Sequence, residues 1–129
     1  MGNSISSFRY KVFFEKTRTL RPHFEHLQNR VRTLIGAEND KPCRFELRNA
    51  IRQLKKKIDK ILEMPAEQCP LGERTAINEF RGELRVVLRE LVRSRGQTLT
   101  EFQVAEFLRI FLNNYSELII LRRIFIIIF

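Results

Sequence analysis

Apolar residues recur along the middle of the chain at alternating spacings of three and four, which is the spacing of one face of an α-helix. The clearest run predicts a helix over residues 43–63, and a second run predicts a helix over residues 73–95. The loop 64–72, which contains two prolines, should make these helices antiparallel neighbours. The predicted core comprises Leu47, Ile51, Leu54, Ile58, Ile61, Ile77, Phe80, Leu84, Leu88 and Leu91.

Two shorter helices are expected before this pair. Residues 8–20 predict a short helix with aromatic side chains on a basic background. Pro22 suits the first turn of the next helix, and Gly36 closes that helix. A polar loop over residues 37–42 follows, in which Asp40 is the expected N-cap of the long helix.

The last helix and the C-terminal tail come after Gly96. Thr98 with Glu101 predicts a capping box, and Asn113-Asn114 is expected to break the helix. Residues 118–129 are apolar except for a pair of arginines, which divides them into runs of four and six. A spanning helix needs about 20 apolar residues, so we expect the tail to pack in the core, in an oligomer interface or among lipid headgroups. A membrane span and a strand remain the alternatives.

These segments predict an all-α protein, a compact bundle of four to six helices with a hydrophobic C-terminal tail. A length of 129 residues suits one domain. We expect a flexible N-terminus over residues 1–7, a helical domain over residues 8–113 and the tail over residues 114–129. Only 5 glycines and 4 prolines are available to interrupt helices.

The net charge of +9 lies entirely in the first half of the chain. Residues 1–60 carry 15 Lys and Arg against 6 Asp and Glu, whereas residues 61–129 carry 9 of each. Such a basic half indicates an anionic partner, either phospholipid or nucleic acid, or else a solvated basic surface. On the outer face of helix 43–63, the candidate nucleic-acid-binding residues are Arg44, Arg48, Arg52, Lys55, Lys56, Lys57 and Lys60.

Helix 73–95 also carries many charges, but of both signs. Its arginines recur every four residues at positions 81, 85, 89 and 93, and glutamates at positions 79, 83 and 90 are interleaved with them. Mixed charge at this spacing is typical of a solvated face with ion pairs between residues four apart.

The first six residues, Met1-Gly2-Asn3-Ser4-Ile5-Ser6, fit the pattern for N-myristoylation, with Ser6 at the hydroxyl position. The acyl chain would be attached to the α-amine of Gly2 after removal of Met1. One myristoyl chain gives only reversible membrane binding, with an association constant on the order of 10⁴ M⁻¹, so a second signal is needed. The predicted second signal is the set of cations that binds anionic lipid, namely Arg9, Lys11, Lys16, Arg18 and Arg21.

No catalytic motif is found in the sequence. It has no glycine-rich phosphate loop and no nucleophile elbow, so we expect no enzymatic activity and no cofactor besides the covalent myristate. His23 and His26, with Cys43 and Cys69, lack the ligand spacing of a zinc site. Two cysteines and the lack of a secretory signal indicate a reducing, cytosolic compartment.

A glycine for myristoylation, an adjoining basic surface and a compact helical domain together resemble, in plan, the matrix proteins of retroviruses. The resemblance covers Gly2, Ser6 and the basic positions of residues 9–60. It implies docking on the inner face of the plasma membrane during assembly. The first six residues are also similar to the start of small acylated proteins of plant geminiviruses and of myristoylated bacterial effectors.

The sequence therefore predicts a non-enzymatic, membrane-peripheral viral matrix or accessory protein that acts in assembly or in host interference. It would lie on the cytosolic face of host membranes, or in the cytoplasm when it is not acylated. Host proteins, RNA or further copies of the chain are its expected partners. One alternative is a double-stranded-RNA-binding silencing suppressor that uses helix 43–63. The other is a membrane-permeabilising protein that acts through the tail.

Overall fold

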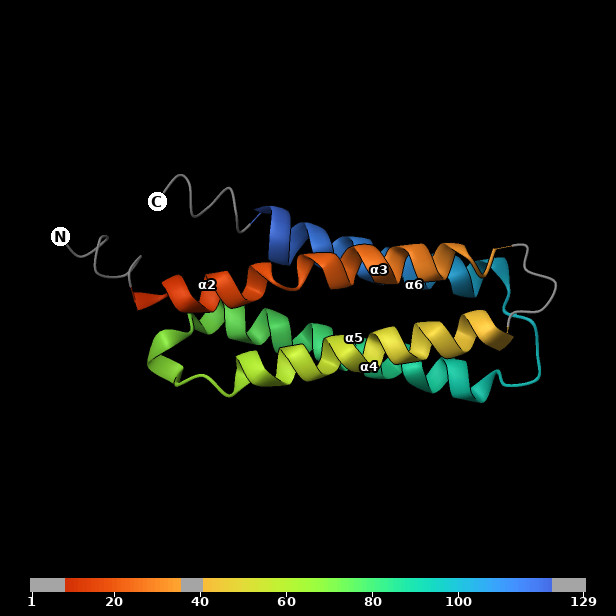
Figure 1. Cartoon of the computed structure of the whole chain (residues 1–129), viewed down its shortest axis with the longest axis horizontal. Helices are drawn as coiled ribbons and strands as arrows, with labels where there is room; N and C mark the ends of the chain where they lie inside the picture. Colours follow the sequence, from red (N-terminus) through yellow and green to blue (C-terminus); the bar gives the residue numbers. More distant parts are fainter. Residues whose placement is uncertain (1–8, 36–40, 122–129) are drawn as a thin grey trace.

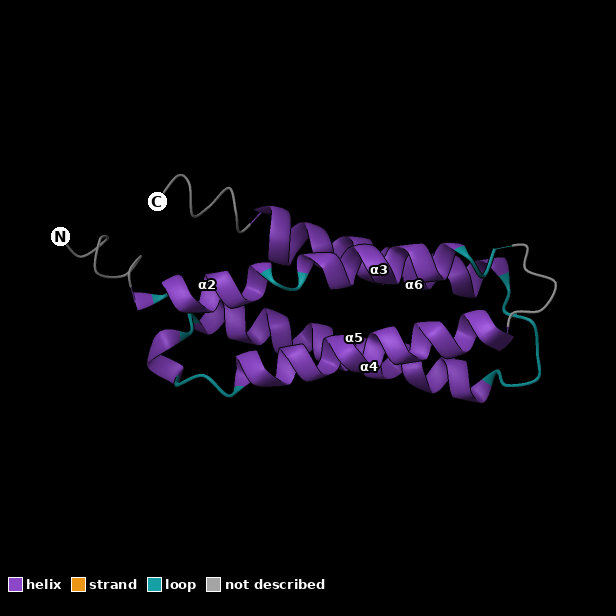
Figure 2. Ribbon diagram, in the orientation of Figure 1, coloured by secondary structure: helices purple, strands orange, loops and turns teal. Residues whose placement is uncertain are grey.

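The computed structural model describes residues 9–35 and 41–121, which form helices and loops with no strand among them (Figure 1, Figure 2). Gly2, Ser6, Asp40 and residues 122–129 lie outside these ranges. The fold is all-α, as predicted. Its helices are α2 (Lys11–Arg18), α3 (Arg21–Arg32), α4 (Lys41–Leu62), α5 (Leu71–Arg93) and α6 (Glu101–Tyr115), with a short 3₁₀ helix η1 (Ala66–Gln68) and a π-helix η2 (Ser116–Leu121) that continues α6.

The helices form a four-membered up-and-down bundle. α2 and α3 follow one another along one edge, and that edge packs against α4 and α6 (Figure 1). α5 packs between α4 and α6, so each member runs antiparallel to its neighbours. The start of α2, the loop with η1, and η2 lie at one end of the bundle, and the loop between α5 and α6 lies at the other. The predicted antiparallel pairing of the two long helices is confirmed.

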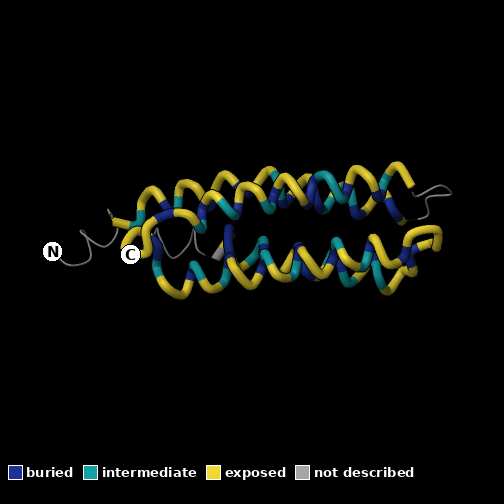
Figure 3. Tube along the Cα trace, turned by 90° about the horizontal axis from the view of Figure 1, so that it is seen from below, coloured by how far each residue is buried: buried dark blue, intermediate teal, exposed yellow. Residues whose placement is uncertain are grey.

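The inner faces of the helices carry the core, as Figure 3 shows. Nine of the ten predicted core residues are buried. Leu88 is the exception, because it is only partly buried, and Val87 takes the core position at 1% exposure. Val87 continues the three-and-four spacing of Phe80, Leu84 and Leu91, whereas Leu88 lies one residue further round the helix.

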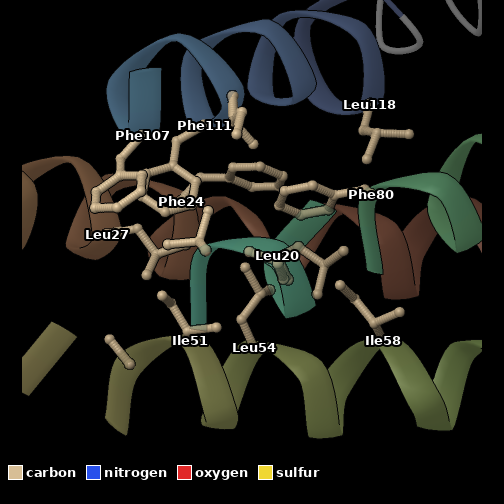
Figure 4. Close-up of a cluster of buried hydrophobic side chains, with 14 of the residues drawn as sticks. Leu20, Phe24, Leu27, Ile51, Leu54, Ile58, Phe80, Phe107, Phe111 and Leu118 are labelled. Carbon is tan, nitrogen blue, oxygen red and sulfur yellow. The ribbon is translucent and has the colours of Figure 1, made fainter. Parts of the chain in front are cut away.

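Aromatic rings fill the centre of the bundle. The ring of Phe24 in α3 stacks on that of Phe80 in α5, with centroids 4.9 Å apart and planes 13° from parallel. The ring centroid of Tyr115 lies 5.7 Å from that of Phe24, with the planes tilted by 58°. Phe107 and Phe111 reach into the same layer from α6 (Figure 4). Since α3 and α5 are diagonal members of the bundle, the Phe24–Phe80 stack joins two helices that are otherwise not neighbours.

The last helix differs from the prediction at both of its ends. Its capping box is Thr100 with Gln103, so the prediction of Thr98 with Glu101 was wrong. The Gln103 N–H donates to Thr100 Oγ1 at 3.1 Å, and the Thr100 N–H donates to Gln103 Oε1 at 2.8 Å. Leu99 before the cap and Val104 after it both belong to the core, which is the arrangement of a hydrophobic staple and fixes the cap between them.

The expected break at Asn113-Asn114 was also wrong. α6 runs through both residues and continues as η2 to Leu121. Asn114 is buried, and its Nδ2 donates to the Ile110 carbonyl at 2.8 Å and to Glu83 Oε1 at 3.4 Å. These two partners satisfy the side-chain amide inside the bundle, so Asn114 is accommodated within the helix. The first residues of the expected tail, among them the buried Leu118 and Ile119, thus pack in the helical domain.

Two arginines cap the ends of the α4–α5 pair. Arg44 was predicted on the outer face, but its side chain is buried and donates to the Ser94 carbonyl at 2.8 Å and to the Gln97 carbonyl. Ser94 is the C-cap of α5. At the other end, Arg74 Nη2 donates to the carbonyl of Leu62, the last residue of α4, at 3.1 Å. Each helix thus supplies a guanidinium that donates to carbonyls at the C-terminal end of its partner.

Arg44→Met should lower the free energy of unfolding by about 2 kcal/mol, because it removes the hydrogen bonds that the buried guanidinium donates to Ser94 and Gln97. Chemical denaturation monitored by circular dichroism measures this. Arg52→Met on the exposed face of the same helix is the matched control and should change the value by less than about 0.5 kcal/mol. Equal losses from the two variants would contradict the capping role of Arg44.

Candidate functional site

The five predicted lipid-binding cations lie just before α2, on α2 and at the start of α3, and all are exposed. Two have a carboxylate partner four residues on: Lys11 Nζ lies 4.0 Å from Glu15 Oε1, and Arg21 Nε lies 3.4 Å from Glu25 Oε1. The Arg9 guanidinium lies over the Tyr10 ring, 5.9 Å from its centroid. Arg9, Lys16 and Arg18 make no ion pair with the described residues, so their charges are available to an outside anion.

The segment before α2 and the segment after η2 join the bundle at the same end. α2 packs against η2, and Figure 1 shows the two elements at one end of the molecule. Val12 of α2 is 48% exposed and Ile120 of η2 is 44% exposed, so this end presents apolar as well as basic side chains.

The seven cations predicted on helix 43–63 do not form one surface. Arg44 is buried, as described above, and Arg48 is half-buried with no hydrogen-bond partner at its Nε among the described residues. Arg52, Lys56, Lys57 and Lys60 are exposed. Lys57 lies on the α3 side, where burial lowers the pKa of His23 and the charges of Lys57 and His26 lower it further.

Lys55 lies on the opposite, α5 side of α4. Burial lowers the pKa of its ammonium group, the guanidiniums of Arg81 and Arg85 lower it further, and Asp59 opposes them. Asp59 Oδ1 is 2.6 Å from Arg81 Nε, so one carboxylate links the two helices. We call the surface formed by Arg52, Lys55, Asp59, Arg81 and Arg85 the α4/α5 seam.

The arginines and the glutamates of α5 lie on different flanks of the helix. Arg81 pairs across to Asp59 on the α4 side, whereas Glu83 accepts a hydrogen bond from Asn114 on the α6 side. At 100° per residue, positions 79, 83 and 90 fall on the glutamate flank, and positions 74, 81 and 85 on the arginine flank. The expected pairing between residues four apart is therefore wrong for Arg81, and Arg93 pairs instead with Glu90, three residues away at 3.9 Å.

Sequence reasoning missed Arg81 and Arg85 as part of a basic surface. Glutamates alternate with these arginines along the sequence, and this alternation led to the prediction that their charges offset one another. The helical period places the arginines and the glutamates on different flanks of α5. Only the order of the helices in the bundle determines which flank packs against α4.

No helix within residues 9–35 and 41–121 is long and apolar enough to cross a membrane. In the same part of the chain, no three His, Cys, Asp or Glu side chains come together to hold a metal ion.

No protein family, curated protein or solved structure matches this chain. The features that bear on function are therefore the basic and apolar end at α2 and η2, and the α4/α5 seam.

Proposed function

We propose that this protein is a non-enzymatic, membrane-peripheral protein that carries myristate on Gly2 and binds anionic phospholipid through the cations of α2. It would act on the cytosolic face of host membranes as a viral matrix or accessory factor, in assembly or in host interference. The observation that carries this proposal is the packing of α2 against η2. It brings the cations of residues 9–18 and the exposed Val12 and Ile120 to one end of the bundle.

The charges of α2 have the size that a second membrane signal requires. A basic side chain near an anionic leaflet contributes about 1 kcal/mol. Arg9, Lys16 and Arg18, which have no carboxylate partner in the described part of the chain, would together contribute about 3 kcal/mol. Lys11 and Arg21 contribute less, because Glu15 and Glu25 offset their charges. Added to one acyl chain, this turns marginal binding into stable attachment.

A triple variant, Arg9→Gln with Lys16→Gln and Arg18→Gln, tests the electrostatic half of this proposal. In the acylated protein it should weaken binding to anionic liposomes about a hundredfold, as about 3 kcal/mol predicts. Liposome flotation at low salt over a range of lipid concentrations measures the affinity. For the wild type, about 1 M salt should have a similar effect, because the screening length falls to about 3 Å.

The matched control is a triple variant that neutralises Arg89, Arg93 and Arg109 with glutamine. It removes the same charge from α5 and α6, and two of its three arginines already face a glutamate. It should float nearly as well as the wild type. Equal losses from the two triple variants, or flotation that salt leaves unchanged, would contradict lipid binding by α2.

A further inference from the structure

The α4/α5 seam concentrates positive charge where two helices meet. Arg52 and Arg85 are exposed, and Lys55 is half-buried between the helices. The only carboxylate of the seam belongs to Asp59, which is already engaged by Arg81 at 2.6 Å. The four cations Arg52, Lys55, Arg81 and Arg85 thus face this one carboxylate, which leaves the seam with a net charge of +3.

These cations repel one another. The like charges of Arg81, Arg85 and Arg52 act on the Lys55 ammonium, which burial already disfavours in its charged form. An anion bound at the seam would relieve this repulsion. Its electrostatic free energy of binding is therefore more favourable there than beside an isolated surface lysine. The seam is thus a site for a ligand with negative charges.

The shape of the surface indicates which anion it fits. Arg52, Lys56 and Lys60 repeat every four residues on α4, which spaces them about 6 Å apart along the helix axis. The basic surface is therefore elongated, as a polyanion requires. From Arg52 to Lys60, α4 exposes no large hydrophobic side chain, so this stretch has nothing to insert into lipid. The exposed ring of Phe45 lies on the same face, about 10 Å before Arg52 along the helix axis. One ring does not form the row of aromatic side chains on which successive unpaired bases stack.

We infer that the α4/α5 seam binds the phosphate backbone of a nucleic acid duplex, with Arg52, Lys55 and Arg85 as the contacting residues. Guanidinium groups bind phosphate oxygens through two parallel hydrogen bonds. Backbone contacts to a duplex require neither base stacking nor apolar insertion. Figure 1 shows α4 and α5 together on one side of the bundle, so a duplex along this side would leave the end at α2 and η2 accessible to lipid.

The test uses the full-length chain and a short fluorescent RNA duplex of arbitrary sequence, with affinity measured by anisotropy over a range of salt concentrations. The variant Arg52→Gln with Arg85→Gln should bind more weakly than the wild type. The slope of log K against log salt should become shallower by about 2, because each lost phosphate contact contributes about 0.9. The charge-preserving pair Arg52→Lys with Arg85→Lys should keep the wild-type slope.

The matched control is Arg93→Gln with Arg109→Gln, which also removes two exposed positive charges but from arginines that face Glu90 and Glu106. It should leave the slope unchanged. Equal effects of the two glutamine pairs would mean that only net charge matters and would overturn the inference. So would tighter binding to the single strand than to the duplex. An effect of the seam variant on liposome flotation without an effect on duplex binding would equally overturn it and assign the seam to lipid. Thermal unfolding confirms that all variants are folded.

Discussion

Gly2→Ala should abolish stable binding of the full chain to anionic liposomes. A single myristoyl chain contributes an association constant on the order of 10⁴ M⁻¹, or about 5 kcal/mol. Without it, only the cations of α2 remain, and their contribution of about 3 kcal/mol falls as salt screens it. Flotation of protein made in a eukaryotic host measures the loss, and intact mass shows whether Met1 has been replaced by a myristoyl group.

Two controls make this result specific. Ser4→Ala changes a neighbouring residue but keeps Gly2 and Ser6, so it should be acylated and should float. Wild-type protein made without an N-myristoyltransferase should behave like Gly2→Ala. An intact mass without the acyl group, or flotation of Gly2→Ala equal to that of the wild type, would contradict acylation as the membrane anchor. Membrane binding would then have to come from the apolar tail.

Phe80→Ala should lower the free energy of unfolding by about 4 kcal/mol. Phe80 is fully buried, and truncation of a buried phenylalanine to alanine typically costs 3–5 kcal/mol through lost burial and the cavity that remains. The substitution also removes the stacking of this ring on Phe24, which joins two diagonal helices. Chemical denaturation of the variant measures the change.

Phe102→Ala is the control, since Phe102 is 77% exposed on α6, and it should change the stability by less than about 0.5 kcal/mol. A double-mutant cycle between Phe24→Ala and Phe80→Ala should show a coupling energy of about 1 kcal/mol from the stacked rings. Additive effects of the two substitutions would mean that the rings do not interact, and would contradict the packing of α3 against α5 at the centre.

The sequence was sufficient to predict the fold class and most of the core. Helix 43–63 corresponds to α4 at Lys41–Leu62, and helix 73–95 corresponds to α5 at Leu71–Arg93. The hydrophobic periodicity predicts these two helices and their core residues because one face of each helix is buried along its whole length. It fails for Leu88, since two adjacent apolar residues fit the same stripe and only packing decides between them.

The functional surfaces were harder to predict, because they depend on which helices are neighbours. Arg44 has the same sequence signal as Arg52, yet the first caps α5 and the second is exposed. Thr98 and Thr100 both fit the capping pattern, and burial of Leu99 decides in favour of the second. Prediction of the α4/α5 seam would require the order of α4, α5 and α6 around the bundle. The residue pattern of a single helix does not contain this order.

The proposed attachment through the end at α2 and η2 would also set the height of the bundle above the membrane. α4 has 22 residues, which gives a rod about 33 Å long. A bundle attached to lipid through the end at α2 and η2 would stand upright on the bilayer. Its loop between α5 and α6 would then face the cytosol about 30 Å from the lipid headgroups. A protein that recognises this loop could bind every copy in a membrane-attached layer without touching the membrane itself.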